Sequence, residues 1–100
     1  MSETQNNSPL KDQITALLAQ AVSAIAPEAT VNLELERPKN LAHGDFSSNA
    51  AMQLAKPLRC NPRELAQKIL DALPASPLIQ RCEIAGAGFL NFHLTPTAWN

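Results

Sequence analysis

Aromatic residues and long apolar runs are both scarce in this chain. Of its 100 residues, three are Phe, one is Trp and none is Tyr, so the core must be built from Leu, Ile, Val and Ala. No segment approaches the ~20 consecutive apolar residues that a membrane-spanning helix needs. The opening residues, MSETQNNSP, carry neither the basic nor the apolar region of a secretory signal. We therefore expect one small domain without a membrane span, located in the cytoplasm.

Cysteine is also sparse, and this limits the metal and redox chemistry that the chain can support. Cys60 and Cys82 lie far apart and lack CxxC spacing, so we expect two free thiols in a reducing compartment. A zinc site would have to recruit His43 and His93 from unrelated segments, and that spacing matches no structural zinc pattern. The sequence therefore predicts no metal site.

The chain lacks a recognisable catalytic or nucleotide-binding motif. It has neither a GxxxxGK[ST] phosphate loop nor a GxGxxG loop that opens a helix. Ser47 and Ser48 stand near His43, but serines before a helix are more often caps. Asp45 lies in an expected loop, where an aspartate usually bonds nearby backbone groups. We predict no catalytic residue.

Hydrophobic periodicity predicts three helices and three strands. Helical spacing of apolar residues covers 9–25, 50–55 and 62–73, alternation covers 30–36, and two short strands cover 79–84 and 89–94. The expected helix caps are Ser8, then Ser47 or Ser48, then Asn61 in a capping box with Pro62 and Glu64. Pro57 is expected to interrupt or end the second helix.

A sheet with one apolar face must be covered by helices on that face. We therefore predict a two-layer α+β domain, in which three helices pack on a small, mainly antiparallel sheet of three to four strands in the order α-β-α-α-β-β. Whether a fourth short strand forms within 37–46 stays open. The domain is expected over residues 9–95, with tails at 1–8 and 96–100.

The net charge of −1 conceals an uneven distribution. Residues 1–36 carry −4, residues 37–68 carry +4 and residues 69–100 carry −1. A basic segment is compatible with a phosphate-bearing partner. The alternative is an ordinary solvated helix surface, and the charge alone does not separate the two.

The last expected strand carries an aromatic ring on the face that should meet solvent. Leu90, Phe92 and Leu94 fall on one face, whereas Phe89, Asn91 and His93 fall on the other. An exposed aromatic ring can stack on an unpaired base and a neighbouring amide can bond the base edge, as sheet surfaces do with single-stranded RNA. The alternative is that the ring packs under a loop or the C-terminal tail.

Three ordered blocks resemble the N-terminal additional domain of arginyl-tRNA synthetases. They are HGDFSSNAAMQLAK at 43–56, NPRELA at 61–66 and GAGFLNF at 86–92, and the resemblance covers about residues 10–94. Ala87 departs from the pattern, since many relatives have proline there, and this should loosen the turn slightly. We interpret the first block mainly as architecture, with Gly44 at an unusual backbone angle, Asp45 as a turn or capping acceptor and Phe46 as a core anchor.

The resemblance implies a domain that precedes a class I catalytic domain and contacts the D-loop at the outer corner of tRNA-Arg. Carried over by position, the aromatic and amide that meet a D-loop nucleotide are Phe89 and Asn91. His93 is added from strand geometry alone. The other candidates for RNA contact are Arg37, Lys39, Asn49, Lys56 and Arg59.

The resemblance also implies what belongs to the rest of such an enzyme. The HIGH-like and KMSK-like motifs that bind ATP and activate arginine do not occur in these 100 residues. We therefore expect this chain alone to be inactive and monomeric, to hold no cofactor, and to leave ATP and magnesium to the full-length arginine–tRNA ligase. The alternative is a structural module that packs against the rest of the enzyme and touches RNA little.

Overall fold

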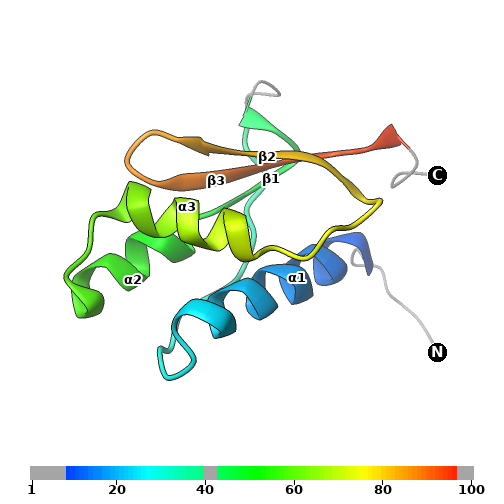
Figure 1. The fold of residues 1–100 in the computed structure, drawn as a ribbon. Helices are drawn as coiled ribbons and strands as arrows, with labels where there is room; N and C mark the ends of the chain where they lie inside the picture. Colours follow the sequence, from blue (N-terminus) through cyan, green and yellow to red (C-terminus); the bar gives the residue numbers. More distant parts are fainter. Residues whose placement is uncertain (1–8, 40–42, 97–100) are drawn as a thin grey trace.

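The computed structural model describes residues 9–39 and 43–96. Its elements are α1 (Pro9–Ile25), β1 (Phe46–Ser48), α2 (Ala50–Leu58), α3 (Pro62–Ala72), β2 (Ile79–Ala85) and β3 (Phe89–Leu94). The strands form one antiparallel sheet in the order β1-β3-β2, and the helices lie together on one side of it (Figure 1). The predicted two-layer α+β domain and its element order are confirmed. Among the described residues, no helix is long and apolar enough to cross a membrane.

The core lies between the sheet and the helices and is mainly aliphatic, as predicted. Its largest fully buried side chains are Phe46, Phe92, Ile14, Leu18, Leu35, Leu54, Ile69 and Leu90. Phe46 of β1 and Phe92 of β3 are cross-strand partners, so the two buried aromatic rings come from neighbouring positions of the sheet. The prediction that Phe46 anchors the core is confirmed, since it is 1% exposed.

The strand predicted over residues 30–36 is wrong. This segment is extended, and its exposure alternates as expected, with Leu35 buried between the exposed Glu34 and Glu36. It meets the sheet at a single bridge, in which Glu36 and Ser47 exchange backbone hydrogen bonds of 2.9 and 2.8 Å. The third strand of the sheet is β1, which begins directly after the loop expected over residues 37–45.

A side chain takes the place of a strand partner for the 30–36 segment. The Gln53 carboxamide of α2 accepts a hydrogen bond from the Asn32 N–H and donates one to the Asn32 carbonyl, each at 2.8 Å. This pair satisfies the backbone as a neighbouring strand would, but at one residue only. The alternating pattern therefore marks a half-buried extended segment rather than a ladder of the sheet.

β1 forms where a helix start was expected. Ser47 and Ser48 were both candidate caps, and both lie in the strand that pairs with β3. Ser48 still serves the helix, because its hydroxyl accepts a hydrogen bond from the Ala50 N–H at 3.1 Å. Asn49 occupies the N-cap position of α2 without a side-chain capping bond. The capping prediction thus holds in part for Ser48 and is wrong for Ser47.

The other helix ends follow the sequence more closely. Asn61 caps α3 as predicted, because its Oδ1 accepts from the N–H groups of Arg63 at 2.8 Å and Glu64 at 3.4 Å. Pro57 lies inside the last turn of α2, which continues to Leu58 and ends at Arg59 in a left-handed conformation, φ 54°. The predicted cap Ser8 and the predicted tails, apart from Pro96, lie outside the described residues.

Candidate nucleic-acid interface

The face of the sheet opposite the helices carries the residues singled out on β3. Across the strands, Phe89 pairs with Ala85, Asn91 with Glu83 and with Ser47, and His93 with Arg81; we call this surface the open face. Phe89 is 38% exposed, and among the described residues the only other large hydrophobic side chain classed as exposed is Leu58 at 41%. The ring is therefore not folded into the core.

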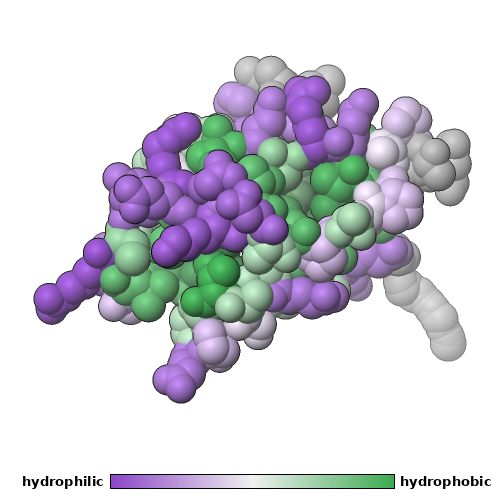
Figure 2. Space-filling model, viewed as in Figure 1, coloured by the Kyte–Doolittle hydropathy of each residue, from purple (hydrophilic) through white to green (hydrophobic). Residues whose placement is uncertain are grey.

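Leu58 belongs to a different part of the surface. It lies at the end of α2 and, with Ile25 and Pro27, lines a shallow apolar groove where α1 and α2 end. Figure 2 shows hydrophilic residues over α3 and hydrophobic residues gathered below it, over α2 and toward α1. The molecule thus exposes apolar groups on both layers, but only the open face combines one with polar strand residues.

Asn91 is not exposed to solvent as the strand pattern predicts. It is 5% exposed, because β3 is the central strand and its neighbours on both sides shield the amide. Within residues 9–39 and 43–96, its side chain makes no hydrogen bond. A buried carboxamide has two donors and an acceptor that a bound ligand could satisfy. The solvent-facing prediction is therefore correct for Phe89 and wrong for Asn91.

Phe89 and Asn91 border the same pocket. Its volume is about 300 Å³, and its lining residues are Pro38, His43, Ser47, Ala85, Gly86, Phe89 and Asn91. Pro38 and His43, which stand on either side of residues 40–42, supply one wall of the pocket, and we call these two residues the loop wall. Sequence reasoning missed that role for Pro38, His43 and Ser47; the register of Ser47 opposite Asn91 appears only once β1 is known.

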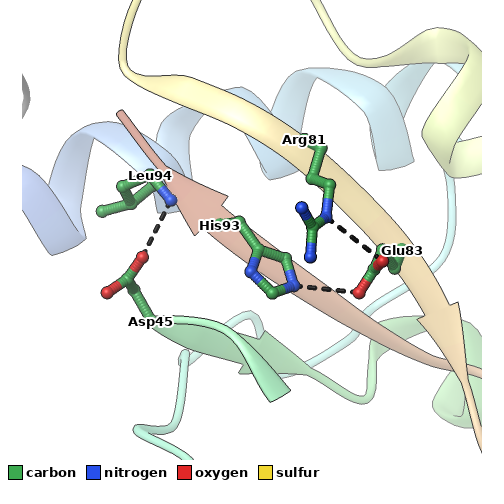
Figure 3. A network of polar contacts seen from close by, with 5 residues as sticks. All are labelled: Asp45, Arg81, Glu83, His93 and Leu94. Atoms are coloured by element: carbon green, nitrogen blue, oxygen red, sulfur yellow. Dashed lines mark hydrogen bonds and ion pairs between the residues drawn. The ribbon is translucent and has the colours of Figure 1, made fainter. Parts of the chain in front are cut away.

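His93 is held in a polar network beside the pocket. Its Nε2 lies 2.9 Å from Glu83 Oε1 and donates in the tautomer protonated there, while Arg81 Nε donates to Glu83 Oε2 at 3.1 Å (Figure 3). The His93 side chain is 13% exposed. The hydrogen bond from His93, with a further contribution from the charge of Arg81, lowers the pKa of Glu83 against the opposing effect of its partial burial. Glu83 therefore orients the imidazole as an ionised carboxylate.

Gly44 and Asp45 anchor the loop wall to the end of β3. Asp45 donates its backbone N–H to the Phe92 carbonyl and accepts from the Leu94 N–H through Oδ2, both at 2.8 Å. Gly44 has φ +91°, and a Cβ there would lie 2.7 Å from the Phe92 carbonyl oxygen. The prediction for Gly44 is confirmed. Asp45 is an acceptor as predicted, but it accepts from the backbone of β3 and not from a turn or a helix cap.

The charged and amide candidates divide between the two layers. Arg37 and Lys39 are exposed beside the loop wall, with the Arg37 guanidinium 5.6 Å from the centroid of the Phe46 ring. Lys56 and Arg59 lie at the C-terminal end of α2, in the helical layer (Figure 1). Asn49 precedes α2, and its Oδ1 accepts a hydrogen bond from Gln53 at 2.8 Å. Phe89, Asn91 and His93 thus share the open face, whereas Arg37 lies at the ring of the core residue Phe46 and the α2 residues lie in the helical layer. Lys39 is exposed two residues after Arg37.

Neither cysteine lies on the open face, since Cys60 stands between α2 and α3 and Cys82 pairs across the strands with the core residue Phe92. Cys60 and Cys82 are free thiols. Burial, and after it the charge of Glu83, raises the pKa of the Cys82 thiol to about 12, so its thiolate is not available near neutral pH. In the two described segments, no group of three or more His, Cys, Asp or Glu side chains is arranged to hold a metal ion.

The fold and this surface define a small α+β domain whose sheet presents an exposed aromatic ring beside an amide-lined pocket. Residues 12–94 match the family of the arginyl tRNA synthetase N terminal domain. The arginine–tRNA ligase of Thiobacillus denitrificans is 66% identical over 92 residues, and that of Bordetella pertussis is 59% identical over 90 residues. The chain belongs to the arginyl-tRNA synthetase N-terminal domain family.

Solved structures share the fold. The Thermus thermophilus arginyl-tRNA synthetase matches 89% of this chain with a TM-score of 0.75 and 29% identity. The Plasmodium falciparum arginyl-tRNA synthetase matches 94% of this chain with a TM-score of 0.75, and at 14% identity it supports the fold alone. The match covers 92% of this chain but 16% of the Thiobacillus protein, and 86% of this chain but 16% of the Bordetella protein. The two structural matches cover 14% and 17% of the solved chains. The chain thus spans about one sixth of the length of these relatives.

Proposed function

We propose that this chain is the tRNA-binding domain of an arginine–tRNA ligase and that its open face meets the D-loop of tRNA-Arg. The observation that carries this proposal is the exposed ring of Phe89 at a pocket that also contains the buried Asn91 carboxamide. An unpaired base offers a π-face to the ring and hydrogen-bonding edge groups to the amide. His93 lies on the same face of β3, and Arg37 and Lys39 flank Pro38 of the pocket lining in the sequence, where their charges are suited to phosphate contacts.

In this proposal the domain contributes binding energy and not chemistry. The full-length ligase would use ATP and magnesium in a downstream class I catalytic domain, in the cytoplasm and as a monomer. Contacts far from the reacting atoms can orient the acceptor end of the tRNA for that domain. The α2 candidates Asn49, Lys56 and Arg59 lie in the other layer, so we assign them at most a secondary contact with RNA.

The test compares Phe89→Ala with Leu58→Ala in the full-length ligase that carries this domain. Both variants remove an exposed apolar side chain, but only Phe89 lies on the open face. Loss of one stacking contact is worth about 1–3 kcal/mol, so we expect the KM for tRNA-Arg to rise by about 5- to 150-fold in Phe89→Ala. The KM values for arginine and ATP at saturating tRNA should stay at the wild-type values in both variants.

A specific observation would favour the structural-module alternative. If the rest of the ligase covers the open face, Phe89→Ala should lower thermal stability and change all three KM values together. The salt dependence of the affinity for tRNA gives a second criterion, since phosphate contacts release counterions and packing between protein domains does so much less. An unchanged KM for tRNA in Phe89→Ala would overturn the proposal.

A further inference from the structure

The hairpin tip that carries Phe89 packs closely against the start of α3. Gly88 has φ +138°, and a Cβ there would lie 2.9 Å from Pro62 Cβ and 3.1 Å from the Pro62 carbonyl carbon. Gly88 is buried although it stands in a hairpin loop. The turn therefore rests on the first residue of α3, with no space for a side chain between them.

Arg63 adds a directional bond to this contact. Its Nη1 donates a hydrogen bond to the Gly86 carbonyl, joining positions 23 residues apart in the sequence. Within the hairpin loop, Gly88 also donates its N–H to the Ala85 carbonyl at 3.1 Å. The side-chain hydrogen bond from Arg63 thus connects the hairpin turn to the first turn of α3.

Gly86 lies next to the Phe89 ring, and both residues line the same pocket. A Cβ built on Gly86 would lie 3.6 Å from Phe89 Cδ2, at ordinary van der Waals distance, so the ring edge lies beside the Gly86 backbone. The ring lies outside the buried core, so its position depends on the turn and on the other residues of the pocket. A displacement of the Gly86 peptide would consequently displace the ring.

The base of this arrangement is well fixed. Asn61 caps α3 through the N–H groups of Arg63 and Glu64, and α3 packs through the buried Leu65 and Ile69. The first turn of α3 is therefore a rigid support from which Arg63 reaches the hairpin. An exposed arginine without such a hydrogen bond would have no fixed side-chain position.

We infer that Arg63 is a positioning residue, which holds the Phe89 ring in place for a base of the tRNA by fixing the Gly86 carbonyl. This inference rests on the proposed function of the open face. A preorganised ring loses less conformational freedom when it binds, so affinity falls if the turn is released. Because Arg63 acts through Phe89, its effect should vanish when the ring is absent.

The test is a double-mutant cycle in the full-length ligase with Arg63→Ala, Phe89→Ala and the combination, read as the KM for tRNA-Arg. A hydrogen bond of this kind predicts that Arg63→Ala raises the KM about 3- to 10-fold. In the Phe89→Ala background, Arg63→Ala should add less than about 2-fold. Lys68→Ala, which removes an exposed positive charge from the same helix, should leave the KM unchanged.

Two further measurements separate positioning from other roles. A residue that contacts phosphate lowers the slope of log affinity against log salt by about one, whereas a positioning residue leaves it unchanged. Arg63→Lys keeps a donor near Gly86 and should recover most of the affinity. Thermal unfolding of each variant shows whether a loss of affinity merely reflects a loss of folded protein.

The outcomes distinguish this inference from the proposed function. Additive effects of Arg63→Ala and Phe89→Ala, or a salt slope reduced by about one in Arg63→Ala, would overturn the positioning role alone. An unaffected KM in Phe89→Ala would overturn the proposed function and this inference with it. We expect Arg63→Ala to raise the KM for tRNA-Arg when Phe89 is present and to raise it little further in the Phe89→Ala background.

Discussion

The two faces of β3 behave differently although they alternate residue by residue along one strand. Toward the helices, Leu90, Phe92 and Leu94 are buried by a core that the sequence pattern makes evident. On the open face, Phe89 is exposed but Asn91, two residues later, is 5% exposed. The alternating sequence pattern therefore assigns a residue to one face of the sheet. The solvent exposure of a side chain on the open face also depends on the neighbouring strands and on the loop wall. The following predictions test this difference, beginning with the largest effect.

Phe92 and Phe89 form a matched pair of rings on the same strand. Phe92 is fully buried, so Phe92→Ala should lower the free energy of unfolding by about 3–5 kcal/mol. Phe89→Ala should change it by less than about 1 kcal/mol, because the ring is partly in solvent. Urea denaturation of the 100-residue chain measures both values. Equal losses would show that the open-face ring is a core residue after all.

Gly44 links the loop wall to the end of β3, and a side chain at this position would collide with backbone. Gly44→Ala places a Cβ 2.7 Å from the Phe92 carbonyl oxygen at φ +91°, so we expect a loss of about 2–3 kcal/mol. Gly86→Ala is the matched control, because φ is also positive there but the nearest atom is 3.6 Å away, and it should cost about 1–2 kcal/mol. If Gly86→Ala lowered the free energy of unfolding more than Gly44→Ala, the close approach of residue 44 to the Phe92 backbone would not be the main constraint.

Gln53 supplies two of the hydrogen bonds that hold residues 30–36 extended. Gln53→Ala removes both hydrogen bonds to the Asn32 backbone and should lower the free energy of unfolding by about 1–2 kcal/mol. Gln67→Ala on α3 is the control, since Gln67 bonds only the exposed Asp71 side chain, and it should change stability by about 0.5 kcal/mol or less. Hydrogen exchange at the Asn32 amide should accelerate in Gln53→Ala alone.

Glu83, which lies on the open face, should make the stability of the fold depend on pH. Its pKa is lowered in the folded state, chiefly by the hydrogen bond from His93, so ionised Glu83 stabilises the fold above its unfolded pKa. This contribution is lost as the pH falls through the folded pKa. Glu83→Gln should therefore flatten the decline of Tm on the acidic side, by a small amount because the carboxylate is half exposed. An unchanged decline in Glu83→Gln would show that the network contributes nothing.

The sequence predicts the fold well where a local pattern has one structural solution. The α3 cap at Asn61, the hairpin turn with two positive-φ glycines and the buried face of β3 all follow from short motifs. The segment 30–36 has a strand pattern, but the Gln53 side chain occupies the place of a neighbouring strand. That outcome depends on a contact 21 residues away, which alternation cannot encode.

The candidate site is predictable in its central residues and not in its walls. Phe89 stands out because an aromatic ring interrupts the expected polar face, and Asn91 is singled out as the amide beside it and by the family resemblance. The pocket around them requires the register of β1 against β3 and the positions of Pro38 and His43 in the fold. The support from Arg63 requires the packing of α3 against the hairpin, and a basic residue in the first turn of a helix gives no signal of it.

An NMR titration of the 100-residue chain with a tRNA-Arg transcript, at about 50 and 200 mM salt, tests the central claim most directly. The account predicts amide shifts confined to residues 86–93 and the 37–39 segment, with smaller shifts at the higher salt concentration. The signals of α1 should stay in place. Shifts centred on the helical layer, with the open face unaffected, would contradict the account.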